Sequence, residues 1–316
     1  RRIFRSQDIL VATTAGQRLK HMSGIENRVA VLIVNFNAGD ALTRCVESVL
    51  SQGRGIRVVI VDNASTDNSA RSVNELFGRL DNVSVVFNEE NLGFSRAVNQ
   101  AANSLQDSSY PSLLVLNPDC ELFPGALRAL VEALENQPVA AMTGPNVVDR
   151  HGAPMRGTYR RFPDPWRSFL TFTGLWRLGH SFPSFEGVEP IRDLPLETGE
   201  AEALSGACML IRKNAFFELG GMDEAYGLHC EDLDLMYRME QAGMKRLFVP
   251  GARVYHLQGL SSSKRPAWVH WQKHLGMQRF FKQHQADRYI LPLRWLVIAG
   301  IWVRFLFTLP LELIRK

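Results

Sequence analysis

The fold of this chain is decided by the stretch Leu113-Leu114-Val115-Leu116-Asn117-Pro118-Asp119-Cys120. Its apolar run stops abruptly at Asn-Pro-Asp. Because Pro118 lacks a backbone donor and disfavours the helical conformation at Asn117, the run predicts a buried strand that ends at Leu116. Ligands of open α/β sheets bind beyond the carboxyl ends of the strands. We therefore expect Asp119 to lie at a ligand site.

Three similar strands are expected before this one, over residues 29–34, 57–61 and 83–87. Segments whose apolar residues have helical spacing separate the strands, around residues 40–52, 73–77 and 97–105. This alternation predicts an α/β fold with a mainly parallel, doubly wound sheet and helices on both faces.

The pattern is less regular after residue 123. A helix is expected over 124–135, followed by two short strands near 139–142 and 146–148. Proline, glycine, arginine and aromatic residues are scattered through 150–198, which predicts a flexible insertion or a pair of short helices there. Order is expected to return with an apolar run at 204–211, a short helix at 214–219, a helix opened by Glu231, and closing strands at 245–249 and 253–256.

The composition is that of an ordinary globular protein. Hydrophobic residues make up 46% and charged residues 22% of the 316 residues, which excludes a disordered chain. The net charge of +4 is too mild to imply nucleic acid, and no nucleic-acid motif is present. None of the four cysteines belongs to a Cys-x-x-Cys pair, so reduced core thiols of a cytosolic protein are expected. Residues 1–27 read as a basic lead-in without the apolar run of a secretory signal.

The C-terminal segment, residues 263–316, differs in kind. Its last part is strongly apolar, but only nine residues separate Arg294 from Arg304, too few to cross about 30 Å of hydrocarbon. Trp295 and Trp302 near these arginines are typical of a helix that lies in the membrane interface. A helix packed on the domain or in a homo-oligomer, and a true membrane span, remain alternatives.

Polar groups follow several of the expected strands. Asp62 ends one strand, and the loop with Asn91 and Arg96 follows another. Because the carboxyl ends of parallel strands meet at one edge of a sheet, these groups should converge with Asp119 on a nucleotide site. The alternative for Asp119 alone is a turn residue that caps the next helix.

Three carboxylates stand within four residues at Glu231, Asp232 and Asp234. A favourable interaction with the helix dipole explains one or two of them, and a carboxylate held near a hydroxyl can also act as a general base. His256 ends an apolar strand, where a histidine is often structural. A carboxylate and an imidazole together would suit Mn²⁺ or Mg²⁺.

With these residues assembled, the chain resembles the family 2 glycosyltransferases, inverting enzymes of the GT-A fold, and especially their rhamnosyltransferase-like members. The matching motifs extend from Val31 to about Ser263 and are specific in their order and spacing. They are Val34-Asn35-Phe36-Asn37, Val61-Asp62-Asn63-Ala64-Ser65-Thr66-Asp67, Asn91-Leu92-Gly93-Phe94-Ser95-Arg96-Ala97-Val98-Asn99, Leu116-Asn117-Pro118-Asp119, Ser205-Gly206-Ala207 and Glu231-Asp232-Leu233-Asp234-Leu235.

The resemblance implies a role for each candidate residue. Asp232 would be the catalytic base, with Glu231 beside it. Asp119 would bind a divalent cation, Mg²⁺ or Mn²⁺, with His256 completing the coordination. The nucleotide sugar would be held by polar residues of the same motifs, namely Asn35, Asn37, Asp62, Asn63, Asn91, Arg96, Asn117 and Asp234.

Three departures from the family pattern modify these expectations. Asn117 replaces the first carboxylate of the Asp-x-Asp motif, which weakens the expected metal dependence. Asn63 follows Asp62 where many members have a second aspartate. Leu291 precedes Arg294-Trp295 where processive synthases have glutamine, so addition of one or a few sugars is expected.

The resemblance therefore implies transfer of rhamnose or a similar hexose in bacterial surface polysaccharide synthesis. The donor would be a dTDP- or UDP-linked sugar bound by residues 28–123. The acceptor, a glycan or polyprenyl-diphosphate-linked hydroxyl, would be bound by residues 124–262. The enzyme would act in the cytoplasm, peripherally on the inner face of the cell membrane, through residues 263–316.

Two other functions remain as alternatives. A nucleotidyltransferase would need a glycine-rich phosphate loop, and residues 34–40 contain only Gly39. A non-catalytic sugar-nucleotide-binding protein would need no base. Glycosyl transfer requires that Asp119 and Asp232 face one crevice.

Overall fold

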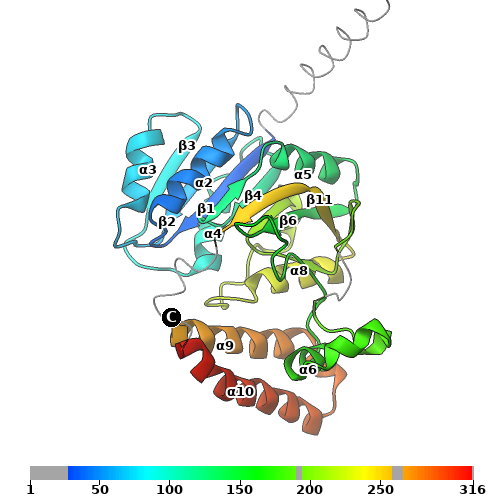
Figure 1. The fold of residues 1–316 in the computed structure, drawn as a ribbon. Helices are drawn as coiled ribbons and strands as arrows, with labels where there is room; N and C mark the ends of the chain where they lie inside the picture. Colours follow the sequence, from blue (N-terminus) through cyan, green and yellow to red (C-terminus); the bar gives the residue numbers. More distant parts are fainter. Residues whose placement is uncertain (1–27, 190–193, 258–265, 315–316) are drawn as a thin grey trace, which may run out of the picture.

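The computed structural model describes residues 28–189, 194–257 and 266–314 (Figure 1). The expected lead-in at 1–27 and the expected domain boundary near 262 lie outside the described residues. An α/β body carries a pair of long helices, α9 and α10, on its lower side (Figure 1).

One sheet forms the centre of the body, with the order β3-β2-β1-β4-β10-β6-β11-β5 and β8 paired to β11. Its first half is parallel, as predicted from the apolar runs. It consists of β1 (Val29–Asn35), β2 (Arg57–Asp62), β3 (Val83–Phe87) and β4 (Ser112–Leu116). Parallel pairing places the polar ends of β1 and β2 side by side, with Asn35 in register with Asp62.

The second half of the sheet is mixed. β10 (Cys208–Arg212) runs antiparallel to both β4 and β6 (Ala140–Val148). β11 (Lys245–His256) runs parallel to β6 and antiparallel to β5 (Cys120–Leu122). The two pairs of short strands expected here are single long strands, and β11 absorbs a register shift between Val249 and Arg253. Pro250 within this shift has no backbone donor, which accounts for the interruption seen in the sequence.

Helices cover both faces of the sheet. Successive residues of β1 point to opposite faces of the sheet, so that Leu32 and Ile33 belong to two different apolar clusters. One cluster is completed by α2 (Asp40–Leu50), α3 (Ser69–Phe77) and α5 (Ala126–Glu135). The other is completed by α4 (Phe94–Asn103), α7 (Lys213–Glu218) and α8 (Glu231–Gln241). Burial on both faces explains why the strands are continuously apolar. All four cysteines are free and buried, as predicted.

The segment after β6 contains short helices, which confirms one of the two forms expected for it. They are α6 (Pro165–Thr173) and the 3-10 helices η1 (Leu175–His180) and η2 (Pro183–Phe185). Asp164 caps α6 by accepting a hydrogen bond from the Arg167 backbone, and Gly174 ends it in the left-handed conformation. Before α6, β7 (Tyr159–Arg160) pairs with β9 (Ala203–Leu204) in a small second sheet. The remaining short strand is β8 (Gly199–Glu200).

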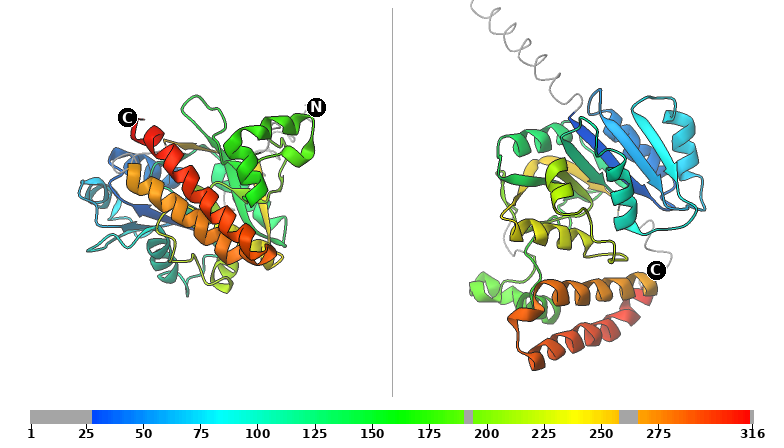
Figure 2. Two further views of the ribbon diagram at one scale, coloured as in Figure 1. Left: turned by 90° about the horizontal axis from the view of Figure 1, so that it is seen from below. Right: turned by 180° about the vertical axis from the view of Figure 1, so that it is seen from behind.

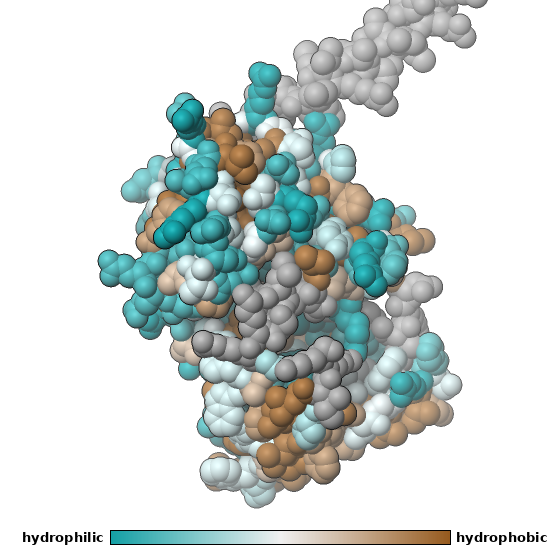
Figure 3. Space-filling view, turned by 60° about the vertical axis from the view of Figure 1, so that its left-hand side comes forward, coloured by the Kyte–Doolittle hydropathy of each residue, from teal (hydrophilic) through white to brown (hydrophobic). Residues whose placement is uncertain are grey.

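The C-terminal part is a helical hairpin of α9 (Pro266–His284) and α10 (Leu291–Ile314), joined by the 3-10 helix η3 (Ala286–Arg288). The two helices lie side by side across the lower side (Figure 2, left). The rings of Trp271 and Trp302 are 4.8 Å apart, and the Trp302 indole donates to Gln278. The outer face of α10 exposes apolar side chains such as Trp295, Leu296, Leu306 and Phe307, and brown, apolar residues gather at this lower end (Figure 3).

In the described part of the chain, α10 is the one helix long and apolar enough to cross a membrane, judged by length and composition alone. Its segment Leu291–Leu313 has a mean hydropathy of 1.8 in its most apolar window, and none of that window is buried. Arg304, which interrupts the apolar sequence, turns inward against α9. The outer face of α10 is therefore more uniformly apolar than the sequence indicated.

Candidate active site

The polar ends of β1 and β2 are joined by side-chain hydrogen bonds. The amide of Asn35 donates to Oδ1 of Asp62 at 2.7 Å and to the hydroxyl of Ser69 at 2.8 Å. Asp62 also accepts from the hydroxyl and the backbone N–H of Ser65. Asn35 and Asp62 are both buried. The sheet register thus places these two predicted donor-binding residues in contact.

The neighbouring asparagines organise the loops of the same edge. Asn37, with a φ of 55°, accepts hydrogen bonds from the backbone of Thr66 and Asp67. Asn63 donates to Asn91, 3.0 Å away, and accepts from the backbone of Leu92. Short polar side chains that bond nearby backbone groups stabilise turns of this kind. These residues therefore fix the shape of the rim of the expected donor site.

Arg96, expected near the donor, is on the exposed side of α4. Its guanidinium pairs with Glu224 at 3.4 Å, and Asn99 of the same helix donates to Glu224 and to the backbone of Met222. α4 is thereby tied to the segment that leads into α8.

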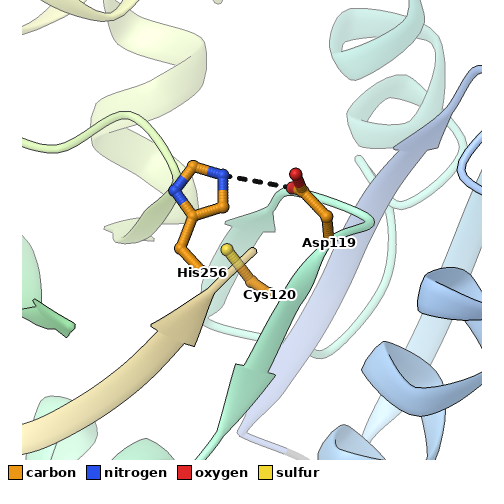
Figure 4. Close-up of side chains that lie close together, drawn as sticks. All are labelled: Asp119, Cys120 and His256. Carbon is orange, nitrogen blue, oxygen red and sulfur yellow. Dashed lines mark ion pairs between the residues drawn. The ribbon is translucent and has the colours of Figure 1, made fainter. Parts of the chain in front are cut away.

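A cluster with metal-ligand chemistry lies at the end of β4 (Figure 4). Asp119 follows β4, while His256 ends β11 and is in register with Cys120 of β5. The Leu257 backbone N–H donates to the Asp119 carbonyl at 3.0 Å. This pairing places Oδ1 of Asp119 3.2 Å from Nε2 of His256. Two residues far apart in sequence are thus brought together by β5–β11 pairing.

The donor set fits Mg²⁺ or Mn²⁺. Two atoms that occupy adjacent octahedral positions about 2.1 Å from an ion lie about 3 Å apart, close to the observed separation of the two side chains. Cys120 belongs to the same cluster. Burial and the Asp119 charge raise the pKa of its thiol well above the ordinary range. Carboxylate oxygen and imidazole nitrogen suit Mg²⁺ or Mn²⁺ better than a thiol does, so Asp119 and His256 are the two candidate ligands of this cluster.

Asp232 lies in the first turn of α8. His229 and Cys230 both have positive φ, and these two left-handed residues turn the chain into the helix. Oδ2 of Asp232 accepts a hydrogen bond from Arg160 of β7, which also donates to the Leu204 carbonyl. The expected base is thus held between β7 and α8.

Gly206 provides the room for Asp232. A Cβ added at this glycine would lie 2.7 Å from Oδ2 of Asp232, closer than real Cβ contacts allow. The next residue, Ala207, accepts a hydrogen bond from the Asn117 backbone N–H at 2.9 Å. The turn at 205–207 therefore contacts both Asp232 and the Asn-Pro-Asp segment that carries Asp119.

The other two carboxylates of α8 have different environments. Glu231 is buried, and Oε2 has no hydrogen-bond partner among the described residues. Burial and the Asp232 charge raise its pKa to about 8, so it is a neutral acid at pH 7. Asp234 has no exposed side-chain surface and binds Arg238 at 2.8 Å and His284 at 2.7 Å. This burial disagrees with substrate binding by Asp234, whose contacts instead fasten α9 to α8.

Arg160 was not identified from the sequence as a site residue. It stands in an irregular segment among several other arginines. Its position depends on the pairing of β7 with β9, in which Arg160 is opposite Ala203. A two-residue strand has no recognisable sequence pattern, so the position of Arg160 next to Asp232 could not be predicted from the sequence.

Comparisons with known proteins identify the family of the chain. Residues 30–218 match the family described as Glycosyl transferase family 2. The N-acetylglucosaminyl-diphospho-decaprenol L-rhamnosyltransferase of Mycobacterium tuberculosis is 30% identical over 87% of this chain and 90% of that protein. The rhamnosyltransferase WbbL of Escherichia coli is 22% identical over 72% of this chain and 83% of that protein.

Solved structures show a similar fold. A mannosyltransferase from Pyrobaculum calidifontis in complex with GDP-Man and Mn²⁺ has a TM-score of 0.56 at 16% identity, covering 90% of this chain and 72% of that one. GalNAc-T7 with UDP, GalNAc and Mn²⁺ has a TM-score of 0.55 at 20% identity over 84% of this chain. This chain spans about half of the GalNAc-T7 chain, 54%. The family match and these likenesses lead to one conclusion: the chain belongs to glycosyltransferase family 2 and has the GT-A fold.

Proposed function

We propose that this protein transfers a sugar, rhamnose or a similar hexose, from a nucleotide diphosphate to a hydroxyl of a lipid-linked acceptor, with inversion at the anomeric carbon. One observation carries this proposal. The Asn-Pro-Asp segment that carries Asp119, the partner of His256, and the side chain of Asp232 both contact the turn at 205–207, so the proposed cation site and the proposed base adjoin the same short segment.

Residues 28–123 would bind the donor. The bonded ends of β1 and β2, with Asn35 and Asp62, lie at the carboxyl edge of the parallel half-sheet, where nucleotides bind in this fold class. The base would be uracil or thymine of a UDP- or dTDP-sugar. Its diphosphate would extend toward Asp119.

The cation would be held by Asp119 and His256, and when bound it would offset the charge that develops on the leaving diphosphate. Polar side chains of the protein would determine how the donor binds beside the cation. The loops that are joined by the hydrogen bond between Asn63 and Asn91 would orient the donor. Arg96, which is exposed at the rim, would lie near the phosphates of the donor.

Asp232 would act as the general base. It would take the proton of the acceptor hydroxyl as that oxygen attacks the anomeric carbon on the face opposite the nucleotide diphosphate. One displacement breaks the bond to the diphosphate, forms the new glycosidic bond and inverts the configuration. Glu231, protonated at pH 7, would not compete for this proton.

A polyprenyl-diphosphate-linked sugar is the acceptor that the relatives favour. The name of the Mycobacterium tuberculosis relative says that it acts on N-acetylglucosaminyl-diphospho-decaprenol. The exposed apolar face of α10 would rest on the inner face of the cell membrane and bring residues 124–262 to such a lipid. The reaction would belong to bacterial cell-wall or surface polysaccharide synthesis.

A donor panel tests the proposal. Purified protein is given dTDP-rhamnose and other dTDP-, UDP- and GDP-sugars with a synthetic N-acetylglucosaminyl-diphospho-prenol, and nucleotide release and the product anomer are measured. We expect transfer from one donor class, an inverted product, dependence on Mn²⁺ or Mg²⁺, and loss of activity in EDTA. Donor binding without release would indicate a non-catalytic sensor, and pyrophosphate release from nucleoside triphosphates would indicate a nucleotidyltransferase.

A further inference from the structure

Each helix of the hairpin carries a half-buried cationic side chain. Lys273 of α9 is half-buried, and Arg304 of α10 turns inward. Nη1 of Arg304 lies 3.4 Å from Nε2 of His274 and 3.2 Å from Sδ of Met277. These two contacts hold the Arg304 guanidinium against the turn of α9 that follows Lys273.

This part of α9 adjoins the entrance to α8. A Cβ at Gly276 would lie 2.6 Å from the His229 carbonyl oxygen and 3.4 Å from Sγ of Cys230. One turn earlier, Gln272 approaches Gly227 equally closely. Because residues 227–230 lead directly into Asp232, the hairpin packs against the segment that positions the expected base.

The two cations have no anionic partner in the part of the chain that the structure describes. Neither Lys273 nor Arg304 forms an ion pair with a carboxylate there. Burial lowers the pKa of each group, and the charge of Arg304 lowers the pKa of Lys273 further. Glu312 raises the pKa of both but contacts neither as an ion pair. A bound anion would stabilise two half-buried cations of this kind, because burial removes part of the water that solvates their charges.

The field of these groups extends to the catalytic side. The charges of Lys273 and Arg160 both lower the pKa of His229, whose value of about 4 results mainly from burial. Lys273 also lowers the pKa of the Cys230 thiol, which burial raises. The charge of Lys273 therefore acts on the segment that leads into Asp232, whereas the Asn-Pro-Asp segment that carries Asp119 contacts the turn at 205–207.

We propose that Lys273 and Arg304 bind the diphosphate of the lipid-linked acceptor. The inference rests on the proposed function and identifies the acceptor subsite within it. The order of groups in such an acceptor is lipid tail, diphosphate, sugar. The order in the protein is the apolar outer face of α10, the cations at the α9–α10 boundary, and Asp232. A helix is about 10 Å across, so the boundary lies within the depth of a membrane headgroup region.

The kinetic test compares two acceptors that differ only in the diphosphate. One is an N-acetylglucosaminyl-diphospho-prenol, and the other is an alkyl N-acetylglucosaminide. For Lys273→Gln and Arg304→Gln we expect the KM for the diphosphate acceptor to rise at least tenfold, with the donor KM and the rate on the alkyl acceptor unchanged. Lys282→Gln, an exposed cation of the same helix, is the matched control and should behave as wild type. Equal losses on both acceptors, or no loss, would overturn the inference.

A binding test separates this inference from the proposed function. Farnesyl diphosphate is titrated calorimetrically into full-length protein saturated with UDP and Mn²⁺, which occupies the donor side. Wild type and Lys282→Gln should bind, and the Lys273→Gln/Arg304→Gln double variant should bind at least tenfold more weakly, with an unchanged thermal unfolding midpoint. If the wild type bound farnesyl diphosphate no better than the double variant, the subsite would be refuted even in an active transferase. If binding were selective but no sugar moved, the subsite would stand and the proposed function would fail.

Discussion

Arg160 donates a hydrogen bond to Oδ2 of Asp232, and this ion pair joins strand β7 to the first turn of α8. Both side chains are largely buried, with 20% and 16% of their surfaces exposed. Arg160 is itself held by the Leu204 carbonyl, so its guanidinium is a fixed support. The pair defines the orientation of the proposed base before any acceptor arrives.

Replacing Arg160 by glutamine should therefore lower kcat more than it changes donor KM. Loss of a group that orients a reactive side chain typically reduces activity by about 10- to 100-fold. Steady-state kinetics on Arg160→Gln and Arg160→Lys measure the effect, and lysine should restore part of the rate because it keeps the charge. A larger change in donor KM than in kcat would instead place Arg160 at the donor.

Asp232→Asn should abolish most turnover but leave nucleotide binding intact. Asparagine can still accept the Arg160 hydrogen bond, but it cannot take a proton, and loss of a general base costs about 100- to 10,000-fold in rate. Calorimetric UDP or dTDP binding checks the second half of the prediction. Asp287→Asn, at an exposed carboxylate of η3, is the control. Near-normal rates in Asp232→Asn would mean that another group is the base.

Gly206→Ala tests the close approach at the turn. The added Cβ would stand 2.7 Å from Oδ2 of Asp232, so the carboxylate or the turn must move. Small displacements of reacting groups can cost about 100-fold in rate. We expect such a loss in kcat, measured beside Gly251→Ala, where a Cβ would meet nothing within 4 Å. Equal activity in the two variants would argue against a tight Asp232 site.

His256→Ala should raise the Mn²⁺ concentration needed for half-maximal activity by about 10- to 100-fold, because one of two protein ligands is lost. Dialysis against EDTA should inactivate the wild type, and Mn²⁺ should restore it. Cys120→Ala is the matched comparison, since the thiol is adjacent to the pair but is a poor ligand for Mn²⁺. A similar rise in that variant would show that the sulfur binds the ion.

The stability of the fold should depend on pH through Glu231. Its pKa is about 8 in the folded protein and about 4.5 when unfolded, so ionisation disfavours the folded state. The resulting loss of stability develops as pH rises from about 4.5 to about 8. Glu231→Gln removes it, and the variant should gain more than about 1 kcal/mol relative to wild type between pH 5 and pH 8.

Urea unfolding at the two pH values measures this difference, and any pH-independent effect of the amide cancels. Glu132→Gln, at an exposed position of α5, provides the comparison and should show no such gain. The same gain in both variants would contradict a special environment for Glu231.

The sequence alone was sufficient for the parallel half of the sheet and for the polar residues at its carboxyl edge. The strand at Leu113–Leu116 and its neighbours are continuous apolar runs bounded by turn residues, and such local patterns report burial on both faces. The motif at Glu231–Asp232 likewise marks a helix start. In the second half of the sheet, Pro250 interrupts the apolar pattern, so the sequence predicted two short strands. The structure has one continuous strand there, β11.

Only the tertiary structure decided which of these groups meet. His256 lies beside Asp119 because β11 pairs with β5, and Arg160 reaches Asp232 because a two-residue strand pairs with β9. The side chain of Asp234 is fully buried against His284, whereas the side chain of Asp232 keeps 16% of its surface exposed. Contacts of this kind depend on strand register and on helix packing between distant segments. A local pattern specifies which face of an element is apolar, but not which distant element that face will meet.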